Sequence, residues 1–242
     1  MNDLENITAA ILVGGLGTRL RSVISDRPKI LAEINGRPFL AFLLDQLRNV
    51  GIRDVVLCTG YLGKQVEIEF GQVYGSINLQ YSWESSPLGT AGAIRLAADL
   101  FKSESVLVMN GDSYCDTDLK ASWKYHREKD AAGTLLLTRV SDTKRYGRVE
   151  VSPEGTLKGF KEKGSEESEG WINAGIYFLS KKMILSIPAG RKVSLEREVF
   201  PSWIGRGLYG FMSTGRFLDI GTPESFNKAE KILKSGFEYL SQ

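Results

Sequence analysis

The sequence predicts an α/β fold, in which a mostly parallel central sheet carries helices on both faces. Two observations predict it. Through the first half of the chain, short apolar runs alternate with segments whose apolar residues recur every three or four positions, which is the order strand, helix, strand. The first apolar run also ends directly in the glycine-rich stretch 14–20, as expected of a buried parallel strand. With 242 residues, 42% of them apolar, the chain is long enough to bury a large core.

Four apolar runs in the first half are predicted strands. The runs 7–13, 54–60 and 105–112 are almost continuously apolar, which favours burial on both faces. The run 77–84 alternates apolar and polar residues. Ligands of parallel sheets bind beyond the carboxyl ends of the strands, so the loops that follow the first and last of these runs mark the predicted site.

Helices are predicted between these strands. The first has Pro38 as its first residue and ends at Gly51, where a glycine can terminate it. Two more are predicted over 62–70 and 89–101.

The second half is predicted to form a more β-rich part, with strands joined by tight turns. After a helix over 118–129, strands are expected at 134–140, 147–152, 156–163 and 171–179, with a turn at 153–155. A short helix over 194–204 is predicted to be capped by Ser194. A strand near 217–220 leads into a closing helix with Thr222 as N-cap and Pro223 at the first helical position.

Composition excludes several classes of function. Lys and Arg number 31 against 29 Asp and Glu, which gives no electrostatic case for a nucleic-acid partner. No apolar run approaches the roughly 20 residues that cross a bilayer, so we expect no membrane partner and a cytoplasmic protein. Cys58 and Cys115 fall in or beside apolar runs, which predicts buried thiols. The single histidine, His126, lies in the charged sequence KYHREKD and is predicted on a solvated helix face, so histidine catalysis is not expected.

The glycine-rich stretch 14–20 predicts an anion-binding loop. Glycines let backbone N–H groups approach phosphate oxygens, and Arg19 adds a charged fork. A dinucleotide fingerprint would need a third glycine where Leu20 stands and an acid after the second strand; both are missing, which disfavours an oxidoreductase. The spacing of a P-loop is also absent. A glycine-rich turn without a ligand is the structural alternative.

Five motifs, in order along nearly the whole chain, resemble those of sugar-1-phosphate nucleotidylyltransferases. These enzymes join a nucleoside triphosphate to a sugar 1-phosphate and release pyrophosphate. The motifs are GGLGTRL at 14–20 followed by Arg27-Pro28-Lys29, ESSPLGTAG at 84–92, NGD at 110–112, FKEK at 160–163 with NAG at 173–175, and FLDIGTP at 217–223. The resemblance implies a Rossmann-like three-layer sandwich, formed by a single nucleotidyltransferase domain over 1–242. In that domain, 1–115 would mainly bind the nucleotide and 116–242 mainly the sugar phosphate.

The resemblance also implies the site residues. The nucleotide would be bound by Leu12, Val13, Gly14, Gly15, Gly17, Thr18, Arg19, Lys29, Glu84, Pro87, Gly89, Thr90 and Asp112, and the sugar phosphate by Gly147, Glu162, Lys163 and Asn173. Catalysis would rest on Arg19, Lys29, Asp112 and Asp219. Asp112 and Asp219 would hold Mg²⁺, a hard cation that takes carboxylates together with substrate phosphates.

Several of these residues also have a structural interpretation; Glu162 and Asn173, for example, would only satisfy the backbone near strand ends. Asp112 would cap a turn and Asp219 a helix. Lys163 would belong to a charged surface.

Guanine is the base that the residue chemistry favours, with cytosine next. The Glu84 carboxylate can accept both adjacent donors on the pairing edge of guanine. The sequence Val13-Gly14-Gly15 resembles members of the family that form GDP-sugars.

Within the family, the segment 27–40 and the compact length resemble D-glycero-α-D-manno-heptose 1-phosphate guanylyltransferases, which make GDP-heptose for bacterial surface glycans. The alternatives are a mannose-1-phosphate guanylyltransferase, a relative that uses CTP, UTP or dTTP, and a regulatory subunit that senses nucleotide sugars without catalysis. A homodimer through apolar residues such as Trp203 and Phe211 is a further hypothesis; core packing is the other interpretation of both.

Overall fold

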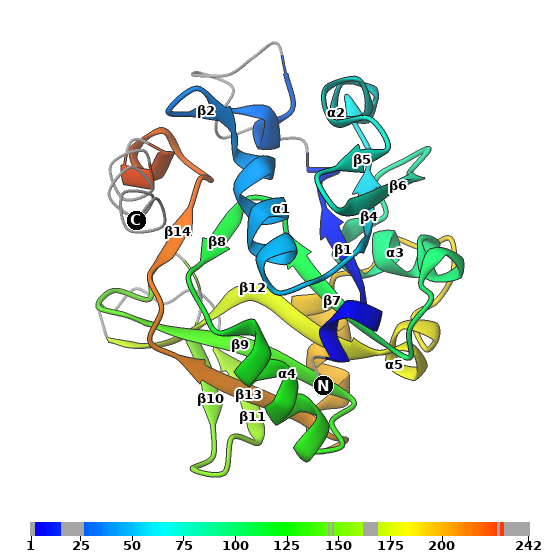
Figure 1. Ribbon diagram of the computed structural model, residues 1–242. Helices are drawn as coiled ribbons and strands as arrows, with labels where there is room; N and C mark the ends of the chain where they lie inside the picture. Colours follow the sequence, from blue (N-terminus) through cyan, green and yellow to red (C-terminus); the bar gives the residue numbers. More distant parts are fainter. Residues whose placement is uncertain are drawn as a thin grey trace.

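An eight-stranded mixed sheet forms the centre of the molecule (Figure 1). The computed structural model describes residues 3–15, 27–144, 146, 148–161, 169–226, 228 and 229. Within these residues the strand order is β13-β9-β12-β7-β1-β4-β6-β5. The strands are β1 (Thr8–Leu12), β4 (Asp54–Thr59), β5 (Val73–Tyr74), β6 (Ile77–Trp83), β7 (Ser105–Asn110), β9 (Gly133–Val140), β12 (Gly170–Ser180) and β13 (Leu208–Ser213).

The four strands predicted in the first half are confirmed as neighbours in one parallel block. β1 pairs with both β4 and β7 in parallel, and β4 pairs in parallel with β6. Their order β7-β1-β4-β6 places the carboxyl ends of all four strands at the same edge of the sheet.

The second half of the chain extends this sheet. β12 is antiparallel to β7 on one side and to β9 on the other, and β13 is parallel to β9. β5 and β13, which form the two edges of the sheet, are short strands that the sequence pattern did not predict. Because β12 lies between β7 and β9, one sheet joins the two halves of the chain.

Three two-stranded ribbons accompany the central sheet. The predicted hairpin is present as β10 (Arg148–Val151) and β11 (Leu157–Lys161). The hairpin of β2 (Glu33–Ile34) and β3 (Arg37–Pro38) was not predicted, although its turn residues Asn35 and Gly36 have φ values of 51° and 74° and are typical of a two-residue hairpin. The third ribbon pairs β8 (Ser113–Cys115) with β14 (Phe217–Asp219). β14 is the strand predicted near 217–220, whereas β8 and the pairing were not predicted.

Helices cover both faces of the sheet, which confirms the three-layer sandwich. Helices α1 (Phe39–Asn49), α2 (Gly63–Phe70) and α4 (Leu119–Glu128) contribute residues to one core. Helices α3 (Gly89–Leu96), α5 (Lys181–Leu185) and α6 (Phe200–Trp203) contribute to the core on the other face. The short turns of helix are η1 (Asp3–Asn6), η3 (Lys29–Leu31), η4 (Ala98–Leu100) and the π-helical η5 (Leu195–Val199).

Two predicted caps are confirmed and one helix start is corrected. The Ser194 hydroxyl accepts the N–H of Arg197 at 3.2 Å, and the Thr222 hydroxyl accepts the N–H of Ser225 at 3.3 Å. Pro38 was predicted as the first residue of α1, but the helix begins at Phe39. Pro38 instead closes the β2–β3 hairpin, where its fixed φ suits an extended residue before a helix.

The interpretation of His126 as solvated is wrong. Its side chain is buried, and its ring lies 5.4 Å from that of Trp123 and 5.6 Å from that of Phe178. Nδ1 lies 2.9 Å from the Thr134 hydroxyl and Nε2 lies 3.4 Å from the Ser105 hydroxyl. The residues around His126 in the sequence are mostly charged. Because α4 is amphipathic, however, His126 is the residue of this helical turn that faces the sheet. Ser105 begins β7, so His126 lies at the opposite edge of the sheet from the strand ends that carry the predicted site.

We expect this burial to make the protein less stable in acid. Burial lowers the pKa of His126 to about 4, whereas the unfolded chain binds the proton near pH 6.5. As the pH falls from 6.5 toward 4, protons therefore bind the unfolded state preferentially, and the free energy of unfolding decreases. Between pH 7.5 and pH 5 this histidine should account for a loss of roughly 2 kcal/mol. Urea unfolding of the wild type and of His126→Gln at both pH values measures it; an equal loss in the two proteins would contradict the prediction.

Both cysteines are free and buried, as predicted. Burial raises the pKa of each thiol, at Cys58 and at Cys115, to about 12. Trp203 is buried in the core on one face of the sheet, and Phe211 is partly buried against the core on the other face, in agreement with the core interpretation of both residues. None of the helices in the described part of the chain has the length and apolar character needed to cross a membrane.

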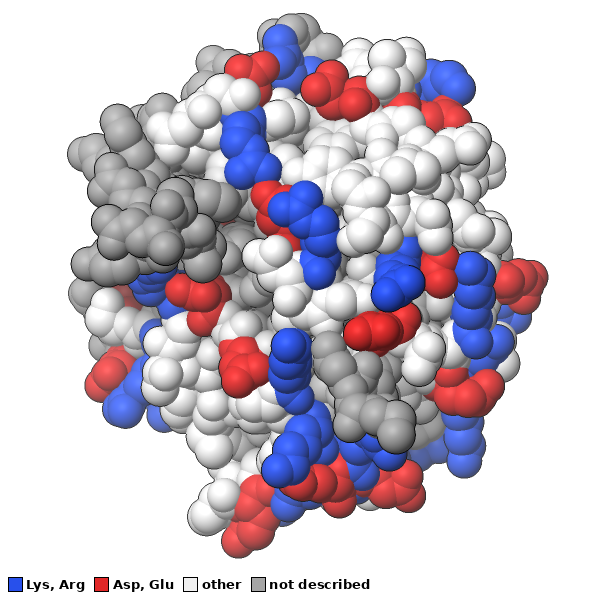
Figure 2. Space-filling model, viewed as in Figure 1, with Lys and Arg blue, Asp and Glu red and all other residues white. Residues whose placement is uncertain are grey.

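Charged side chains of both signs are mixed over the face that Figure 2 shows. Among the described residues several form exposed pairs, for example Arg216 with Asp116 and Lys102 with Asp54. On this face, basic and acidic side chains thus lie close to one another, in keeping with the nearly equal numbers of the two in the sequence.

Candidate functional site

A cavity of about 410 Å³ opens at the carboxyl ends of β1, β6 and β7. Ten of the described residues that line it are predicted site residues: Leu12, Val13, Gly14, Gly15, Lys29, Glu84, Pro87, Gly89, Thr90 and Asp112. The parallel order of the strands brings these residues together from four separate segments of the sequence. This is the edge of the sheet where the sequence placed the site.

Close backbone packing fixes the inner wall of the cavity. β1 and β7 end side by side, with Leu12 in register with Asn110, and the N–H of Gly111 donates to the carbonyl of Leu12 at 2.9 Å. A Cβ on Gly111 would lie 2.5 Å from that carbonyl oxygen. Only glycine therefore fits between the two strand ends.

Replacing Gly111 by alanine is expected to lower the free energy of unfolding by about 2 kcal/mol, because the added methyl group overlaps backbone that cannot move independently. Gly15→Ala is the matched control, since a Cβ at Gly15 would have no neighbour within 4 Å. Chemical unfolding of both variants measures the difference. Equal stability of the two would contradict this account of the wall.

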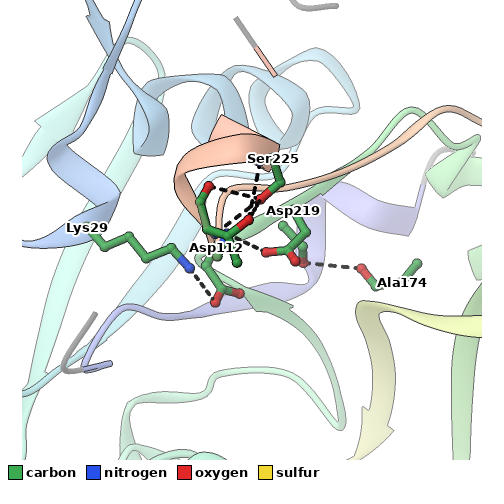
Figure 3. Close-up of polar contacts among 8 residues, drawn as sticks. Lys29, Asp112, Ala174, Asp219 and Ser225 are labelled. Carbon is green, nitrogen blue, oxygen red and sulfur yellow. Dashed lines mark hydrogen bonds and ion pairs between the residues drawn. The ribbon is translucent and has the colours of Figure 1, made fainter. Parts of the chain in front are cut away.

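Lys29 and Asp112 form an ion pair inside the cavity (Figure 3). The Lys29 Nζ lies 2.9 Å from Asp112 Oδ2, and the side chains are 10% and 46% exposed, respectively. Lys29 opens the turn η3, directly after Pro28. An almost buried ammonium group and a half-exposed carboxylate thus face each other in the cavity, at the carboxyl ends of β1 and β7.

The ribbon of β8 and β14 brings Asp112 and Asp219 together although nearly half of the chain separates them (Figures 1 and 3). Asp219 is in register with Ser113, and the N–H of Ile220 donates to the carbonyl of Asp112 at 3.0 Å. Asp219 Oδ1 also accepts the N–H of Gly221 at 2.5 Å. This carboxylate therefore stabilises a turn, whereas the hydroxyl that caps the following helix is that of Thr222. Gly221 lines the cavity.

The two carboxylates fit a magnesium ion that also takes oxygens from a substrate. Within the described residues, no cluster of three or more acidic, histidine or cysteine side chains could hold a metal. Two carboxylates give a hard, oxygen-only donor set, and Mg²⁺ is commonly bound by one or two carboxylates with phosphates and water. Asp112 and Asp219 are therefore suited to a metal that binds together with a phosphate substrate.

Glu84 closes the loop that follows β6. Its N–H donates to the carbonyl of Thr59 at 3.0 Å, and its Oε2 accepts the N–H of Leu88 at 2.9 Å. Partial burial raises the pKa of Glu84, while the bond from Leu88 acts in the opposite sense. The carboxylate predicted to read the base thus also shapes the loop that carries Pro87 into the cavity.

Asn173 lies on β12, where the strand bulges beside β9. Its Oδ1 accepts the N–H of Gly175 and its Nδ2 donates to the Tyr177 hydroxyl, each at 2.8 Å. Gly175 has a φ of 77°, and a Cβ there would lie 2.6 Å from the Ser113 hydroxyl. Asn173 is therefore held firmly next to the strand that carries Asp112, but it does not line the cavity itself.

Several lining residues were not predicted: Ile30, Ala93, Asn110, Gly111, Lys192 and Gly221. Asn110 and Gly111 stand in the NGD motif, whose position after a buried strand was the available signal. Lys192 comes from the loop before η5, which packs on the start of α3 through the bond from the N–H of Ala91 to the carbonyl of Val193 at 3.0 Å. An exposed lysine in a short polar loop gives no sign in the sequence that it faces a cavity.

Six predicted site residues lie outside the described residues: Gly17, Thr18, Arg19, Gly147, Glu162 and Lys163. Their roles stay predictions.

The sequence matches the model of the family described as nucleotidyl transferase over residues 8–236. It is 40% identical over 227 residues to the D-glycero-alpha-D-manno-heptose 1-phosphate guanylyltransferase of Aneurinibacillus thermoaerophilus, with 93% of this chain and 98% of that protein covered. It is 38% identical over 238 residues to the mannose-1-phosphate guanylyltransferase of Mycobacterium tuberculosis, with 96% of this chain and 66% of that protein covered.

Solved structures show the same fold. HddC from Yersinia pseudotuberculosis, crystallised with GMP-PN, superposes with a TM-score of 0.81 at 32% identity, covering 94% of this chain and 99% of that chain. The UDP-glucose pyrophosphorylase from Acinetobacter baumanii superposes with a TM-score of 0.81 at 19% identity, covering 93% and 92%. The second likeness is one of fold alone.

Proposed function

The chain belongs to the nucleotidyl transferase family, and we propose that within it the protein transfers GMP from GTP to D-glycero-α-D-manno-heptose 1-phosphate. The products are GDP-heptose and pyrophosphate, and the pathway supplied is bacterial surface glycan biosynthesis (lipopolysaccharide, capsule or S-layer). The observation that carries the proposal is the cavity, in which ten predicted nucleotide-binding residues and the Lys29–Asp112 ion pair meet at the carboxyl edge of the sheet. The likeness to a heptose 1-phosphate guanylyltransferase over 98% of that protein supports the substrate.

The reaction is an in-line displacement at the α-phosphorus of GTP. An oxygen of the sugar 1-phosphate forms the new P–O bond, and the bond to pyrophosphate breaks. The attacking phosphate is largely ionised at neutral pH, since the second pKa of a phosphate ester is about 6. No protein base is needed, which agrees with the position of His126 at the far edge of the sheet.

The protein contributes placement and charge, the main sources of catalysis in such transfers. Lys29 binds the α-phosphate, and its pairing with Asp112 keeps its Nζ at the place where that phosphate arrives. Arg19 binds the triphosphate and its leaving pyrophosphate, and Lys163 binds the sugar phosphate. Mg²⁺ would be held by Asp112 and Asp219, and when bound it would offset the charge of the reacting phosphates.

Base choice follows from Glu84 at the end of β6. Its carboxylate has two oxygens, each able to accept more than one hydrogen bond. The bond from the N–H of Leu88 uses one site on Oε2 and leaves acceptor capacity for the adjacent donors of guanine.

Mannose 1-phosphate is the second candidate substrate, because 38% identity connects this chain with a mannose-1-phosphate guanylyltransferase. The chain spans only 66% of that protein, compared with 98% of the heptose enzyme. The identity to the heptose enzyme is 40%, against 38% to the mannose enzyme, and heptose 1-phosphate is therefore the first candidate.

The test is a pyrophosphate-release assay that crosses GTP, CTP, UTP, dTTP and ATP with heptose, mannose and glucose 1-phosphates. We expect the highest kcat/KM for GTP with heptose 1-phosphate. A preference for UTP or dTTP would contradict the assignment of Glu84. Tight binding of GTP without pyrophosphate release in any pairing would favour a sensor of nucleotide sugars over an enzyme.

The same proposal includes a single domain over 1–242, with 1–115 mainly for the nucleotide and 116–242 mainly for the sugar phosphate. A homodimer and a cytoplasmic location stay predictions from the sequence.

A further inference from the structure

A partly buried chain of hydrogen bonds connects two cavity-lining residues with Asn173. At its centre are Tyr177, whose side chain is fully buried, and Glu196. Glu196 Oε2 accepts from the Thr90 hydroxyl at 2.9 Å, and Oε1 accepts from the Tyr177 hydroxyl at 3.3 Å. The Tyr177 oxygen in turn accepts from the side-chain amides of Asn173 at 2.8 Å and of Asn110 at 3.5 Å. Thr90 and Asn110 line the cavity.

The direction of each hydrogen bond in this chain follows from Glu196. The Tyr177 hydroxyl donates to Glu196 Oε1, so its single proton is used there. The lone pairs of the Tyr177 oxygen are then left for donors, and Asn173 and Asn110 both turn their Nδ2 toward it. For Asn173 this orientation is fixed independently, because its Oδ1 accepts the N–H of Gly175.

The orientation leaves one polar atom unsatisfied. Asn110 Oδ1 is buried, and no residue of the described chain donates to it. A buried acceptor without a partner lowers stability. A network that keeps such an atom in the wall of a substrate cavity is more typical of a functional site than of a core optimised for packing.

We propose that Tyr177 and Glu196 are positioning residues that set the placement of the two substrates relative to each other. The inference rests on the proposed function, in which Thr90 contacts the nucleotide and Asn173 the sugar phosphate. Neither Tyr177 nor Glu196 is among the residues that line the cavity, so both act through the residues they hold.

The strand order shows that residues proposed to bind the two substrates lie on or just after strands that are far apart in the sheet. Glu84 follows β6 and Asn110 ends β7, three strands away in the order β6-β4-β1-β7. At about 4.8 Å per strand, the positions of Glu84 and Asn110 are about 14 Å apart across the sheet. Asn173 lies one strand further, on β12. Because transfer requires near-contact between reacting atoms, a shift of about 1 Å between the two sides can lower the rate about a hundredfold.

Tyr177→Phe tests the proposal, because it removes the hydroxyl that joins Glu196 to both amides. We expect kcat/KM for the sugar 1-phosphate to fall about 10- to 100-fold, while the Kd of GTP, measured without sugar phosphate, changes less than about threefold. The matched control is Tyr125→Phe, which removes a hydroxyl that donates to the exposed Glu154 carbonyl at 3.3 Å and should leave both quantities unchanged. If Tyr177→Phe lowers Tm but leaves kcat and both KM values near wild type, the network is structural and the proposal is wrong.

A double variant tests the connection through Glu196. Thr90→Val and Tyr177→Phe each remove one hydroxyl from the same carboxylate, so their combined loss in kcat/KM should be close to the larger single loss and well short of the product of the two. A combined loss in kcat/KM equal to the product of the two single losses would show that the two residues act independently and would overturn the proposal. A wild-type protein that releases no pyrophosphate in any pairing contradicts the proposed function and with it this inference, whereas an active wild type with an unchanged Tyr177→Phe variant contradicts this inference alone.

Discussion

Replacing Asp112 by asparagine is expected to reduce kcat about a thousandfold while leaving the fold intact. Asparagine has the same shape but no charge, so it is a poor ligand for Mg²⁺ and pairs only weakly with Lys29. The loss of one placed charge at a reacting phosphate is expected to cost about 10²–10³-fold or more in kcat. Because the Asp112 side chain is 46% exposed, the free energy of unfolding should change by only about 1 kcal/mol.

The measurement is pyrophosphate release under saturating Mg²⁺, together with urea unfolding. Asp116→Asn is the matched control, since Asp116 lies just after the same ribbon and pairs with Arg216 at 3.2 Å at an exposed position. That variant should keep wild-type kcat. A near wild-type kcat for Asp112→Asn would contradict the catalytic role assigned to Asp112.

Replacing Lys29 by methionine is expected to lower kcat by about 10²–10³-fold, because the ammonium group that meets the α-phosphate is lost. Only 10% of the Lys29 side chain is exposed, so methionine can occupy the same space without leaving a cavity. The freed Asp112 carboxylate can still be solvated, and stability should therefore be kept.

The same variant has a second expected result that does not depend on turnover. In the free protein Lys29 competes with a metal for Asp112, so Lys29→Met should bind Mn²⁺ more tightly than the wild type in the absence of nucleotide. Calorimetric titration or electron paramagnetic resonance of Mn²⁺ measures this affinity. The control is Lys102→Met, which removes an exposed lysine paired with Asp54; weaker Mn²⁺ binding by Lys29→Met than by this control would contradict the competition.

The parallel block of the sheet could be predicted because buried strands require continuous apolar sequence. β1, β4 and β7 are such runs, and each is followed by a loop with glycine. The site at their carboxyl ends followed from the same pattern, since parallel strands necessarily end at one edge.

The missed elements lack a local signal of this kind. β5 and β8 are two and three residues long, and no periodicity can be read from so few positions. β8 exists because β14 pairs with it, and that partner comes from the far end of the chain. The local sequence pattern cannot predict the pairing of two strands that are far apart along the chain.

The same limit applies to side chains. His126 was misread because charged neighbours suggested a solvated face, while its position on the helix turns it toward the sheet. Tyr177 and Glu196 look like an ordinary strand tyrosine and an ordinary helix acid in the sequence. Their connection depends on Thr90 arriving from another segment, and only the folded chain shows it.

The ribbon of β8 and β14 makes activity depend on a strand that is synthesised long after Asp112. During synthesis, Lys29, Glu84 and Asp112 all leave the ribosome long before Asp219 exists. The nascent protein can therefore form most of its sheet and still lack one of the two aspartates proposed to hold Mg²⁺. Refolding should show the same delay, with the fluorescence of the buried Trp203 and the partly buried Trp123 and Trp171 recovering before catalysis. Return of pyrophosphate release would then report the closing of one long-range strand pair, and a chain shortened to end before 217 should stay inactive however well the rest of it folds.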